Sequence, residues 1–394
     1  MPITPSERIR SIPAYAFAEV GERVEALRAK GIEPIDFGVG DPADPTPELI
    51  RRALQRAADE RAASGYPSYI GSPELRRAVA DWSERRFGVA IDPDRHVCAT
   101  VGSKEAVFNF PHAFLDPGDR VLVPSPGYPP FQRGTLFAGG TTVFYPLRAE
   151  NRFRAGGALT DEMIADAKIL WVNYPHSPSG TVVDLDELAA LAERCRRYDT
   201  ILASDEAYVD VYFTDAPPPS ILQTGLEGVV AFHSMSKRSA MTGYRIGWVV
   251  GDEQIVGAFK KLKTNIDSGT PTFIQDAAVV ALGDDDHVEA FRAMYRRKRD
   301  LLVGALAGAG LPACPPDGTL FVWQRVPEGM TSVEFAARLL EPEIAIVTTP
   351  GAWLGDDVDG AGNTGEGYVR FALVPTLADC ERAAERIRRN LGGR

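Results

Sequence analysis

The chain has 394 residues, of which 44% are hydrophobic and 25% are charged, as is typical of a soluble globular protein with a large core and two domains. Its formal net charge of -11 gives no support to a nucleic-acid-binding function. The four cysteines lie far apart and show no spacing typical of a metal site or a disulfide framework, so we expect neither.

The N-terminal stretch MPITPSERIRSIP contains no apolar segment of the kind that forms a signal peptide. No apolar run in the chain reaches the roughly 18 residues that a membrane span requires. We therefore expect a cytoplasmic protein.

The middle of the chain alternates between predicted helices and predicted strands. A helix is expected over residues 72–88, beginning at a serine and ending at a glycine. Buried strands are expected in DRVLVPSP, AKILWVNYP, TILASDEAY, GVVAFHS and IGWVVGD. DLDELAALAERCRRYD predicts a helix with one apolar face made by Leu185, Leu188, Ala189 and Leu191. Such alternation favours an α/β domain with a mostly parallel sheet.

From residue 284 onward the pattern changes. A long helix is expected in DDHVEAFRAMYRRKRDLLVGAL, antiparallel strands in GTLFVWQRV and GYVRFALV, and a closing helix in TLADCERAAERIRRNLG. We therefore expect a large domain over residues 46–289. Residues 290–394 would form a smaller α+β domain, which the N-terminal segment 1–45 joins.

The stretch DDVDGAGNTGE (356–366) is similar in composition to a calcium-binding loop. It lacks the acidic residues at alternate positions and the closing glutamate that such a loop requires. A solvated surface loop is the expected structure.

Polar and aromatic residues follow the predicted strands, where an α/β sheet binds its ligands. They are Gly102 and Ser103 at the start of a predicted helix, then Tyr128, Ser177, Asp205, Tyr208, Ser234, Ser236 and Lys237. Because the carboxyl ends of parallel strands meet at one edge of the sheet, these side chains are expected to lie together.

Together these groups match the chemistry of pyridoxal 5′-phosphate. Lys237 offers an amine that can form a Schiff base with its aldehyde, and Asp205 offers a carboxylate for its protonated pyridine nitrogen. A helix start binds its phosphate, and Tyr128 offers a face for its ring. Each residue alone also has a structural explanation: Asp205 as a helix cap, Tyr128 as a core residue, Lys104 as a solvated side chain.

Several motifs resemble those of class I/II aminotransferases of the pyridoxal-phosphate fold type I superfamily, over nearly the whole chain. SDEAY and SMSKRSAMTGYRIG are the most specific, and YPHSPSG is similar to the family's asparagine-proline-threonine-glycine motif. A further resemblance is to the diaminopimelate branch, which includes the LL-diaminopimelate and N-succinyl-diaminopimelate enzymes. It rests on YPSYIGSPELR, GSKEAVFNFP, PGYPPFQRGTLFAGG, KTNIDSGTPTFIQDA and EGYVRFALV.

The resemblance implies roles in cofactor binding. Lys237 would bond the cofactor aldehyde, Asp205 would pair with the pyridine nitrogen, and Tyr208 would bond the phenolic oxygen. Tyr128 would stack on the ring. The phosphate would be surrounded by Gly102, Ser103, Lys104, Ser234, Ser236 and Arg245, and by Tyr66 of a neighbouring subunit, which implies a homodimer.

The resemblance also implies roles in substrate binding. Arg370 would hold the α-carboxylate in a bidentate pair, helped by the backbone of Gly40. Tyr15 would touch the substrate from the N-terminal segment, and Ser268 would face its distal end from the partner subunit.

The chain departs from the family pattern at Ser177, where the family usually has the asparagine that bonds the ring oxygen. Serine is shorter, so this contact is lost or passes through a water molecule. Asn173 is a candidate for compensating, or it supports the loop.

The resemblance implies a ping-pong transamination with 2-oxoglutarate. Lyases and decarboxylases use the same cofactor, but an α-carboxylate clamp at Arg370 favours transamination. A transcription regulator with this fold would carry a DNA-binding domain in front, and the α/β pattern begins within about 40 residues. We therefore expect an enzyme that acts on small amino and oxo acids.

The expected amino donor is diaminopimelate or its N-succinyl form, and aspartate or a broad range of amino acids is the alternative. KTNIDSGTPTF lacks the second arginine that aspartate-preferring enzymes use for the distal carboxylate. It contains Lys263, Asn265, Asp267 and Ser268 instead, which are equally consistent with a plain surface loop.

Overall fold

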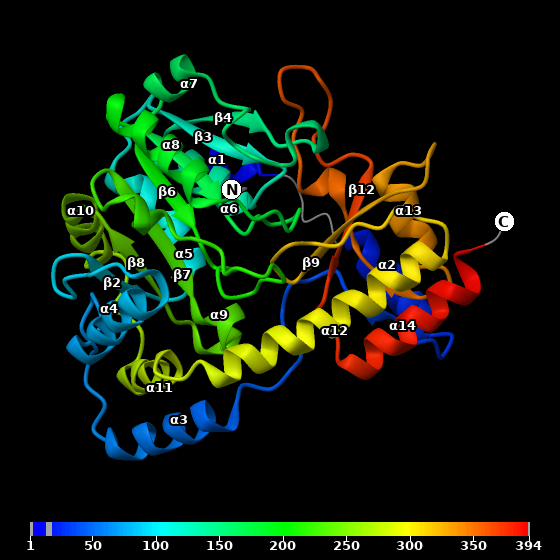
Figure 1. Ribbon diagram of the computed structural model, residues 1–394, viewed down its shortest axis with the longest axis horizontal. Helices are drawn as coiled ribbons and strands as arrows, with labels where there is room; N and C mark the ends of the chain where they lie inside the picture. Colours follow the sequence, from blue (N-terminus) through cyan, green and yellow to red (C-terminus); the bar gives the residue numbers. More distant parts are fainter. Residues whose placement is uncertain (1–2, 13–17, 393–394) are drawn as a thin grey trace.

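The computed structural model describes residues 3–12 and 18–392. A seven-stranded sheet lies at the centre of the larger part of the molecule, and helices cover it on both sides (Figure 1). A smaller part lies beside it and contains the C-terminal strands and helices. Helix α12 (Asp286–Gly308) runs from one part to the other (Figure 1).

The large sheet has the strand order β2-β8-β7-β6-β5-β3-β4. These strands are β2 (Val97–Thr100), β8 (Gly247–Gly251), β7 (Val229–Ser234), β6 (Ile201–Asp205), β5 (Ile169–Asn173), β3 (Arg120–Ser125) and β4 (Thr141–Pro146). Strand β8 runs antiparallel to both of its neighbours, and the other pairs are parallel. The predicted mostly parallel sheet and its five predicted strands are confirmed.

The strands read as continuous apolar runs because both faces of the sheet are buried. In β5, Ile169 and Trp171 belong to one hydrophobic cluster, whereas Leu170 and Val172 belong to another. Successive side chains of a strand point to opposite faces, so the two clusters are the cores on the two sides of the sheet. A rigid, doubly covered sheet of this kind holds its strand ends in fixed positions.

The helices of the larger part are α3 (Glu48–Glu60), α4 (Pro73–Phe87), α5 (Ser103–Asn109), α6 (Pro129–Ala138), α7 (Asp161–Ala165), α8 (Leu185–Arg197), α9 (Met235–Arg238), α10 (Glu253–Lys263) and α11 (Thr272–Leu282). The predicted limits of α4 are confirmed. Its N-cap, Ser72, accepts a hydrogen bond from the N–H of Leu75 at 3.1 Å. Gly88 ends the helix with φ at 69°, a left-handed conformation that glycine adopts without strain.

The predicted apolar face of α8 is partly wrong. Its buried residues are Leu188, Leu191, Ala192 and Cys195, which follow the spacing of one helix face. Leu185, the first residue of the helix, is 36% exposed. Ala189 is only half-buried.

The smaller part contains two short sheets. Strand β1 (Ile35–Asp36) pairs in parallel with β10 (Ile346–Val347). Strand β12 (Tyr368–Ala372) lies between β11 (Thr349–Pro350) and β9 (Phe321–Arg325) and is antiparallel to both, which confirms the predicted antiparallel pair.

The helices outside the large sheet are α1 (Glu7–Arg10), α2 (Ala18–Arg28), α12, α13 (Ser332–Leu339) and α14 (Leu377–Asn390). Helices α12 and α14 lie side by side and share a hydrophobic cluster, to which Leu302 and Ile387 contribute. Residue 290, the predicted start of a second domain, falls inside the unbroken α12. The division of the chain into domains stays a prediction.

The segment 356–366 is not the simple solvated loop that was expected. Asp357 and residues 359–362 are exposed, but Thr364 and Gly365 are buried. Thr364 shares a hydrogen bond of 2.7 Å with the hydroxyl of Ser125 at the end of β3. The segment therefore packs its second half against the large sheet.

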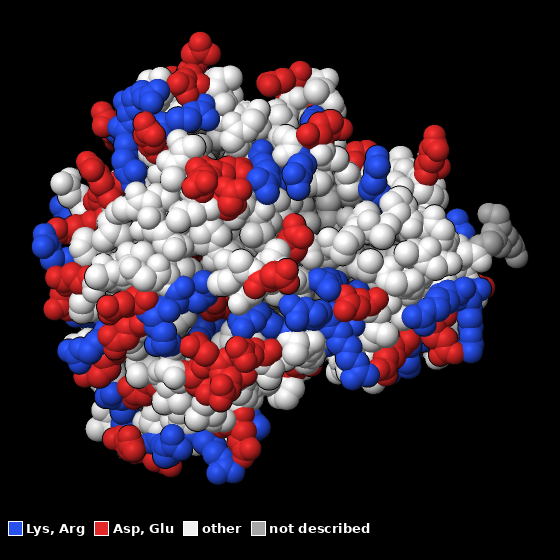
Figure 2. Space-filling model, viewed as in Figure 1, with Lys and Arg blue, Asp and Glu red and all other residues white. Residues whose placement is uncertain are grey.

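The surface carries charges of both signs. Figure 2 shows lysine and arginine interspersed with aspartate and glutamate over the viewed face, without a large area of one sign. Within the part of the chain that the structure describes, no helix is long and apolar enough to span a membrane.

Candidate active site

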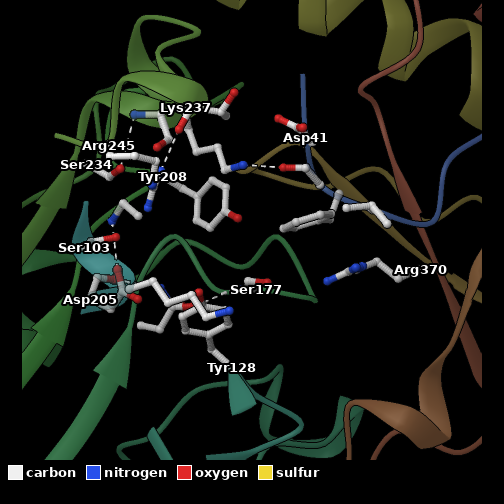
Figure 3. A pocket seen from close by; sticks show the side chains of 18 of the residues that line it. Asp41, Ser103, Tyr128, Ser177, Asp205, Tyr208, Ser234, Lys237, Arg245 and Arg370 are labelled. Carbon is white, nitrogen blue, oxygen red and sulfur yellow. Dashed lines mark hydrogen bonds between the residues drawn. The ribbon is translucent and has the colours of Figure 1, made fainter. Parts of the chain in front are cut away.

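A cavity of about 620 Å³ lies at the carboxyl ends of the parallel strands, between them and the smaller part (Figure 3). Most of the predicted site residues line it. They are Gly40, Ser103, Lys104, Tyr128, Ser177, Asp205, Tyr208, Ser234, Ser236, Lys237, Arg245 and Arg370. The expected convergence of these side chains follows from the topology, because β5, β6 and β7 are adjacent parallel strands.

Lys237 enters the cavity from the short helix α9, directly after β7. The hydroxyl of Ser234 caps this helix by accepting from the N–H of Ser236 at 3.2 Å. The Lys237 Nζ donates a hydrogen bond to the carbonyl of Gly40 (Figure 3). Burial lowers the pKa of Lys237 to about 8. The carboxylate of Asp41 opposes this shift, and the positive charge of Arg370 adds to it. The amine is therefore available as a base near neutral pH.

Asp205 is the last residue of β6 and is 4% exposed. Its carboxylate accepts from the N–H of Ala207 at 3.1 Å and forms no ion pair with the described residues. Burial raises the pKa of Asp205 to about 7, and the bond from Ala207 opposes this only partly. A buried carboxylate without a cation partner is a suitable site for a positively charged group of a ligand.

Arg245 forms the cationic side of the cavity, close to Gly102. Its own backbone adopts a left-handed φ of 53°, which is uncommon for a non-glycine residue. One guanidinium nitrogen donates to the carbonyl of Thr242 at 2.6 Å. A Cβ atom at position 102 would overlap this guanidinium, and Gly102 has a positive φ of 78°. The arginine, together with the hydroxyls of Ser103, Ser234 and Ser236, offers a site for an anion.

Arg370 points into the cavity from β12, on the side opposite to Lys237 (Figure 3). Its Nη2 donates to the carbonyl of Gly38 at 2.9 Å and to the hydroxyl of Thr349 at 3.3 Å. Its Nε is buried and has no partner among the described residues. The guanidinium lies 4.4 Å from the ring centre of Phe321. Burial lowers the pKa of Arg370 to about 10, so it remains a cation with free hydrogen-bond donors for a carboxylate.

Two aromatic hydroxyl groups complete the wall of the cavity. Burial raises the pKa of both Tyr128 and Tyr208 well above the usual value, so both phenols keep their protons. Tyr208 packs edge-on against Phe321, with ring centres 5.5 Å apart. Both phenols are therefore hydrogen-bond donors at neutral pH.

The structure resolves the two alternatives for Asn173. Its amide nitrogen donates to the carbonyl of Asp205 at 2.7 Å, and its oxygen accepts from the N–H of Ser177 at 2.9 Å. Both ends of the amide are thus used to hold the loop after β5 against β6. Ser177 lines the cavity and is 8% exposed.

Tyr66 and Ser268, predicted to serve a neighbouring subunit, lie away from this cavity. They line a second one of about 770 Å³, and Tyr66 is 91% exposed. Lys263 and Asp267 were equally consistent with a substrate site and with a plain surface loop. They form an ion pair of 2.6 Å in which the lysine is fully buried, so neither is a free surface residue. Tyr15 lies outside the described residues.

Sequence reasoning missed some residues of the cavity. Asp41 follows β1 and raises the pKa of Lys237, against the effect of burial. Its place next to Gly40, whose backbone was expected to help bind the substrate, was the available signal. Phe321 has no such signal, because it resembles any core residue of β9 until the strand is placed beside Arg370.

Comparison with known proteins agrees with this geometry. A family model described as aminotransferase class I and II matches residues 32–387. The chain belongs to the class I and II aminotransferases. Enzymes of this family move amino groups between amino acids and oxo acids, and they generally use pyridoxal phosphate. The predicted family and enzyme class are confirmed.

The aminotransferase is 43% identical over 388 residues to the LL-diaminopimelate aminotransferase of Aquifex aeolicus, covering 97% of this chain and 98% of that protein. It is 41% identical to the LL-diaminopimelate aminotransferase of Nitratidesulfovibrio vulgaris strain Hildenborough, with 97% and 98% covered. The substrate-bound BacF structure from Bacillus subtilis matches with a TM-score of 0.90 and 30% identity, covering 99% and 98% of the two chains.

A Thermus thermophilus aspartate aminotransferase mutant matches with a TM-score of 0.87 and 29% identity, covering 98% and 100% of the two chains. The aminotransferase therefore has the fold type I architecture that was predicted.

Proposed function

We propose that this aminotransferase transfers an amino group from LL-diaminopimelate to 2-oxoglutarate in a ping-pong reaction, with pyridoxal phosphate held in the Lys237 cavity. The observation that carries the proposal is the 43% identity to an LL-diaminopimelate aminotransferase along the whole chain. The cavity supports it, because it holds an amine, a buried carboxylate and a partly unpaired guanidinium together.

The residues of the cavity fit pyridoxal phosphate. Asp205 is a buried carboxylate without a cation among the described residues, which suits a protonated pyridine nitrogen. Arg245 and three serine hydroxyls can bind a phosphate. Because Gly102 has no Cβ atom, the guanidinium of Arg245 can occupy the space beside it. When bound, pyridoxal phosphate supplies an aldehyde that bonds amines and a ring that withdraws electrons from the substrate.

The residues of the chain then have separate tasks. Arg370 binds the substrate α-carboxylate through its free donors and so orients the substrate Cα. The Lys237 Nζ accepts the proton from Cα, for which its lowered pKa of about 8 is suitable. Tyr208 would donate a hydrogen bond to the phenolic oxygen of the cofactor, and Asp205 would pair with its pyridine nitrogen. Tyr128 and Phe321 line the cavity with aromatic rings, which limits the space for water beside the substrate.

The amino donor is tested by a side-by-side assay with 2-oxoglutarate as acceptor. LL-diaminopimelate should exceed aspartate in kcat/KM by at least about tenfold, which corresponds to about 1.4 kcal/mol. N-succinyl-LL-diaminopimelate, aspartate and an aromatic amino acid are the competitors. A higher kcat/KM for any of them contradicts the proposed donor, while the aminotransferase activity itself stands. Product formation without an oxo acid acceptor would instead indicate a lyase.

Aspartate is the second candidate donor, because the Thermus thermophilus aspartate aminotransferase has the same fold over 98% of this chain. Two lines of support favour diaminopimelate. The curated relatives at 40–43% identity carry that name, whereas the aspartate enzyme is 29% identical. Among the residues that line the Lys237 cavity, the arginines are Arg245 and Arg370, which have the phosphate and the α-carboxylate as partners.

We further propose that two copies of the chain form a homodimer, in which Tyr66 and Ser268 serve the partner's cavity. Tyr66 is 91% exposed and lines a cavity together with Ser268 and Phe273. Such an exposed aromatic side chain supports the proposal that a second copy of the chain covers this surface. Sedimentation velocity should give twice the chain mass of 42.7 kDa. A monomer at catalytic concentration with full activity contradicts this arrangement.

A further inference from the structure

A third cavity, of about 610 Å³, lies directly beside the Lys237 cavity. The two share Tyr128 and Arg370 as wall residues. The third cavity extends from this common wall between helix α6 and residues 352–356. A substrate whose α-carboxylate is bound by Arg370 therefore lies against the wall that the two cavities share.

Three polar side chains of this cavity have no hydrogen-bond or ion-pair partner among the described residues. Gln132 and Arg133 come from α6, and Asp356 follows the turn at residues 351–353. Within residues 3–12 and 18–392, none of the three side chains forms a hydrogen bond or an ion pair. All three are half-buried, so water solvates them only in part. Their polar groups are therefore available to form hydrogen bonds with a ligand in this cavity.

The charges of Arg133 and Asp356 act on each other without direct contact. Burial raises the pKa of the Asp356 carboxyl, and the positive charge of Arg133 opposes this effect. The two groups thus face one space but leave a gap between them. A ligand with one negative and one positive group can occupy that gap and pair with both.

The backbone around Asp356 is held firmly. Its N–H donates to the hydroxyl of Ser125 at 2.8 Å, and its carbonyl accepts from the N–H of Thr364 at 3.1 Å. Helix α6 places Arg133 on the opposite side through a regular element of ten residues. Such fixed positions are what a specificity site requires, because each rotatable group would otherwise lose entropy on binding.

We propose that Arg133 and Asp356 form the subsite for the distal amino-acid head of the substrate, with Arg133 binding its carboxylate and Asp356 its ammonium group. This inference rests on the proposed function and extends it, because it assigns residues to the far end of diaminopimelate. Gln132 offers an amide beside them for a further hydrogen bond. The subsite favours a free second amino-acid head over an N-succinyl group, which has no positive charge for Asp356.

The proposal makes separate predictions for different amino donors. Glutamate has a distal carboxylate but no distal ammonium, and alanine has neither. Asp356→Asn should therefore lower the ratio of kcat/KM for LL-diaminopimelate to that for glutamate at least about tenfold. Arg133→Gln should lower the ratio of kcat/KM for LL-diaminopimelate to that for alanine by a similar factor. In both variants the change should arise mainly in KM for the donor, because the contact lies far from the reacting Cα.

The experiment uses the cofactor-loaded protein with each amino donor in turn and one oxo acid acceptor other than 2-oxoglutarate and pyruvate, because glutamate with 2-oxoglutarate and alanine with pyruvate give no net reaction. Ratios between donors cancel any loss of folded protein in a variant. Arg388→Gln on α14 and Asp215→Asn, which change exposed residues away from the cavity, are the matched controls and should leave both ratios unchanged. Arg133→Lys should recover part of the loss of Arg133→Gln, since it keeps the charge without the fork geometry.

Failures of the two proposals are distinguishable. The wild-type protein could turn over LL-diaminopimelate while Asp356→Asn leaves the ratio of kcat/KM for LL-diaminopimelate to that for glutamate unchanged. This result overturns the subsite and leaves the proposed function intact. A wild-type protein that turns over glutamate but not LL-diaminopimelate overturns both. An Asp356→Asn variant that loses glutamate and LL-diaminopimelate activity in equal proportion also overturns the assignment of the ammonium group.

Discussion

Replacing Asp205 by asparagine should stabilise the cofactor-free protein while impairing its function. Asp205 is 4% exposed, and burial raises its pKa from 3.8 to about 7. One pKa unit corresponds to about 1.4 kcal/mol, so the difference of about 3 makes the ionised carboxylate cost roughly 4 kcal/mol of folding free energy. Asparagine has nearly the same shape, can keep the 3.1 Å bond from the N–H of Ala207, and carries no charge.

The sign of the pH dependence follows from the raised pKa. Between pH 3.8 and about 7 the folded protein holds this proton more tightly than the unfolded chain. The contribution of Asp205 to stability is therefore fully present at low pH and is lost as the pH rises through this window. Glu206, whose pKa burial also raises to about 7, adds a similar trend in the wild type. The difference between variant and wild type isolates Asp205.

The assay is urea unfolding of the cofactor-free proteins at equal concentration over a pH series. The free energy of unfolding of Asp205→Asn relative to wild type should increase by about 2 kcal/mol between about pH 5 and about pH 7. Asp215→Asn, at an exposed position, should show no such trend. The cofactor-loaded Asp205→Asn protein should lose activity, because the charge opposite the pyridine nitrogen is gone. A difference in stability that is independent of pH, or a variant less stable than wild type, would refute this reasoning.

Three further predictions concern the other walls of the cavity. Borohydride reduction of the cofactor-loaded protein should fix the label on Lys237, as peptide mapping would show, and a label on any other lysine removes this assignment. Arg370→Lys should lose about 2–4 kcal/mol of transition-state stabilisation in kcat/KM with little change in cofactor affinity, and an unchanged kcat/KM contradicts its role as the carboxylate clamp. Gly102→Ala should weaken cofactor affinity at least about tenfold, because the new Cβ displaces Arg245 and the left-handed backbone is strained. Gly257→Ala, where a Cβ has open space, is its control and should leave the affinity unchanged in a cofactor titration.

Those parts of the fold that depend on local sequence were predictable. The strands of the large sheet read as apolar runs because both faces are covered, and α4 has a serine cap and a terminal glycine at its two ends. The face of α8 was harder to predict. Several leucines and alanines crowd that segment, and only tertiary packing decides that Cys195 is buried and Leu185 is not.

The candidate site divides in the same way. Lys237, Asp205 and Tyr208 follow strands directly, so the rule for strand ends brings them together. Arg133 and Asp356 could not be paired in this way, because 223 positions separate them (356 − 133). Arg133 lies in PGYPPFQRGTLFAGG and Asp356 begins segment 356–366, but neither stretch indicates that it lies beside the other. The packing of segment 356–366 on Ser125 brings them to one cavity, and a loop of glycines and acidic residues gives no sign of that packing in advance.

The unbroken course of α12 has a mechanical consequence. Arg370 and Lys237 stand on opposite walls of one cavity, and a single 23-residue helix connects the regions that carry these walls. A change in the width of the cavity cannot be absorbed at a loop along this connection; it requires the helix to flex or to pivot as a rod. A helix resists sharp bending unless proline or a bulge interrupts it, and α12 contains no proline. The stiffness of this helix therefore resists a change in the spacing between base and clamp, so a proline placed at its middle should alter catalysis without touching any group that contacts the substrate.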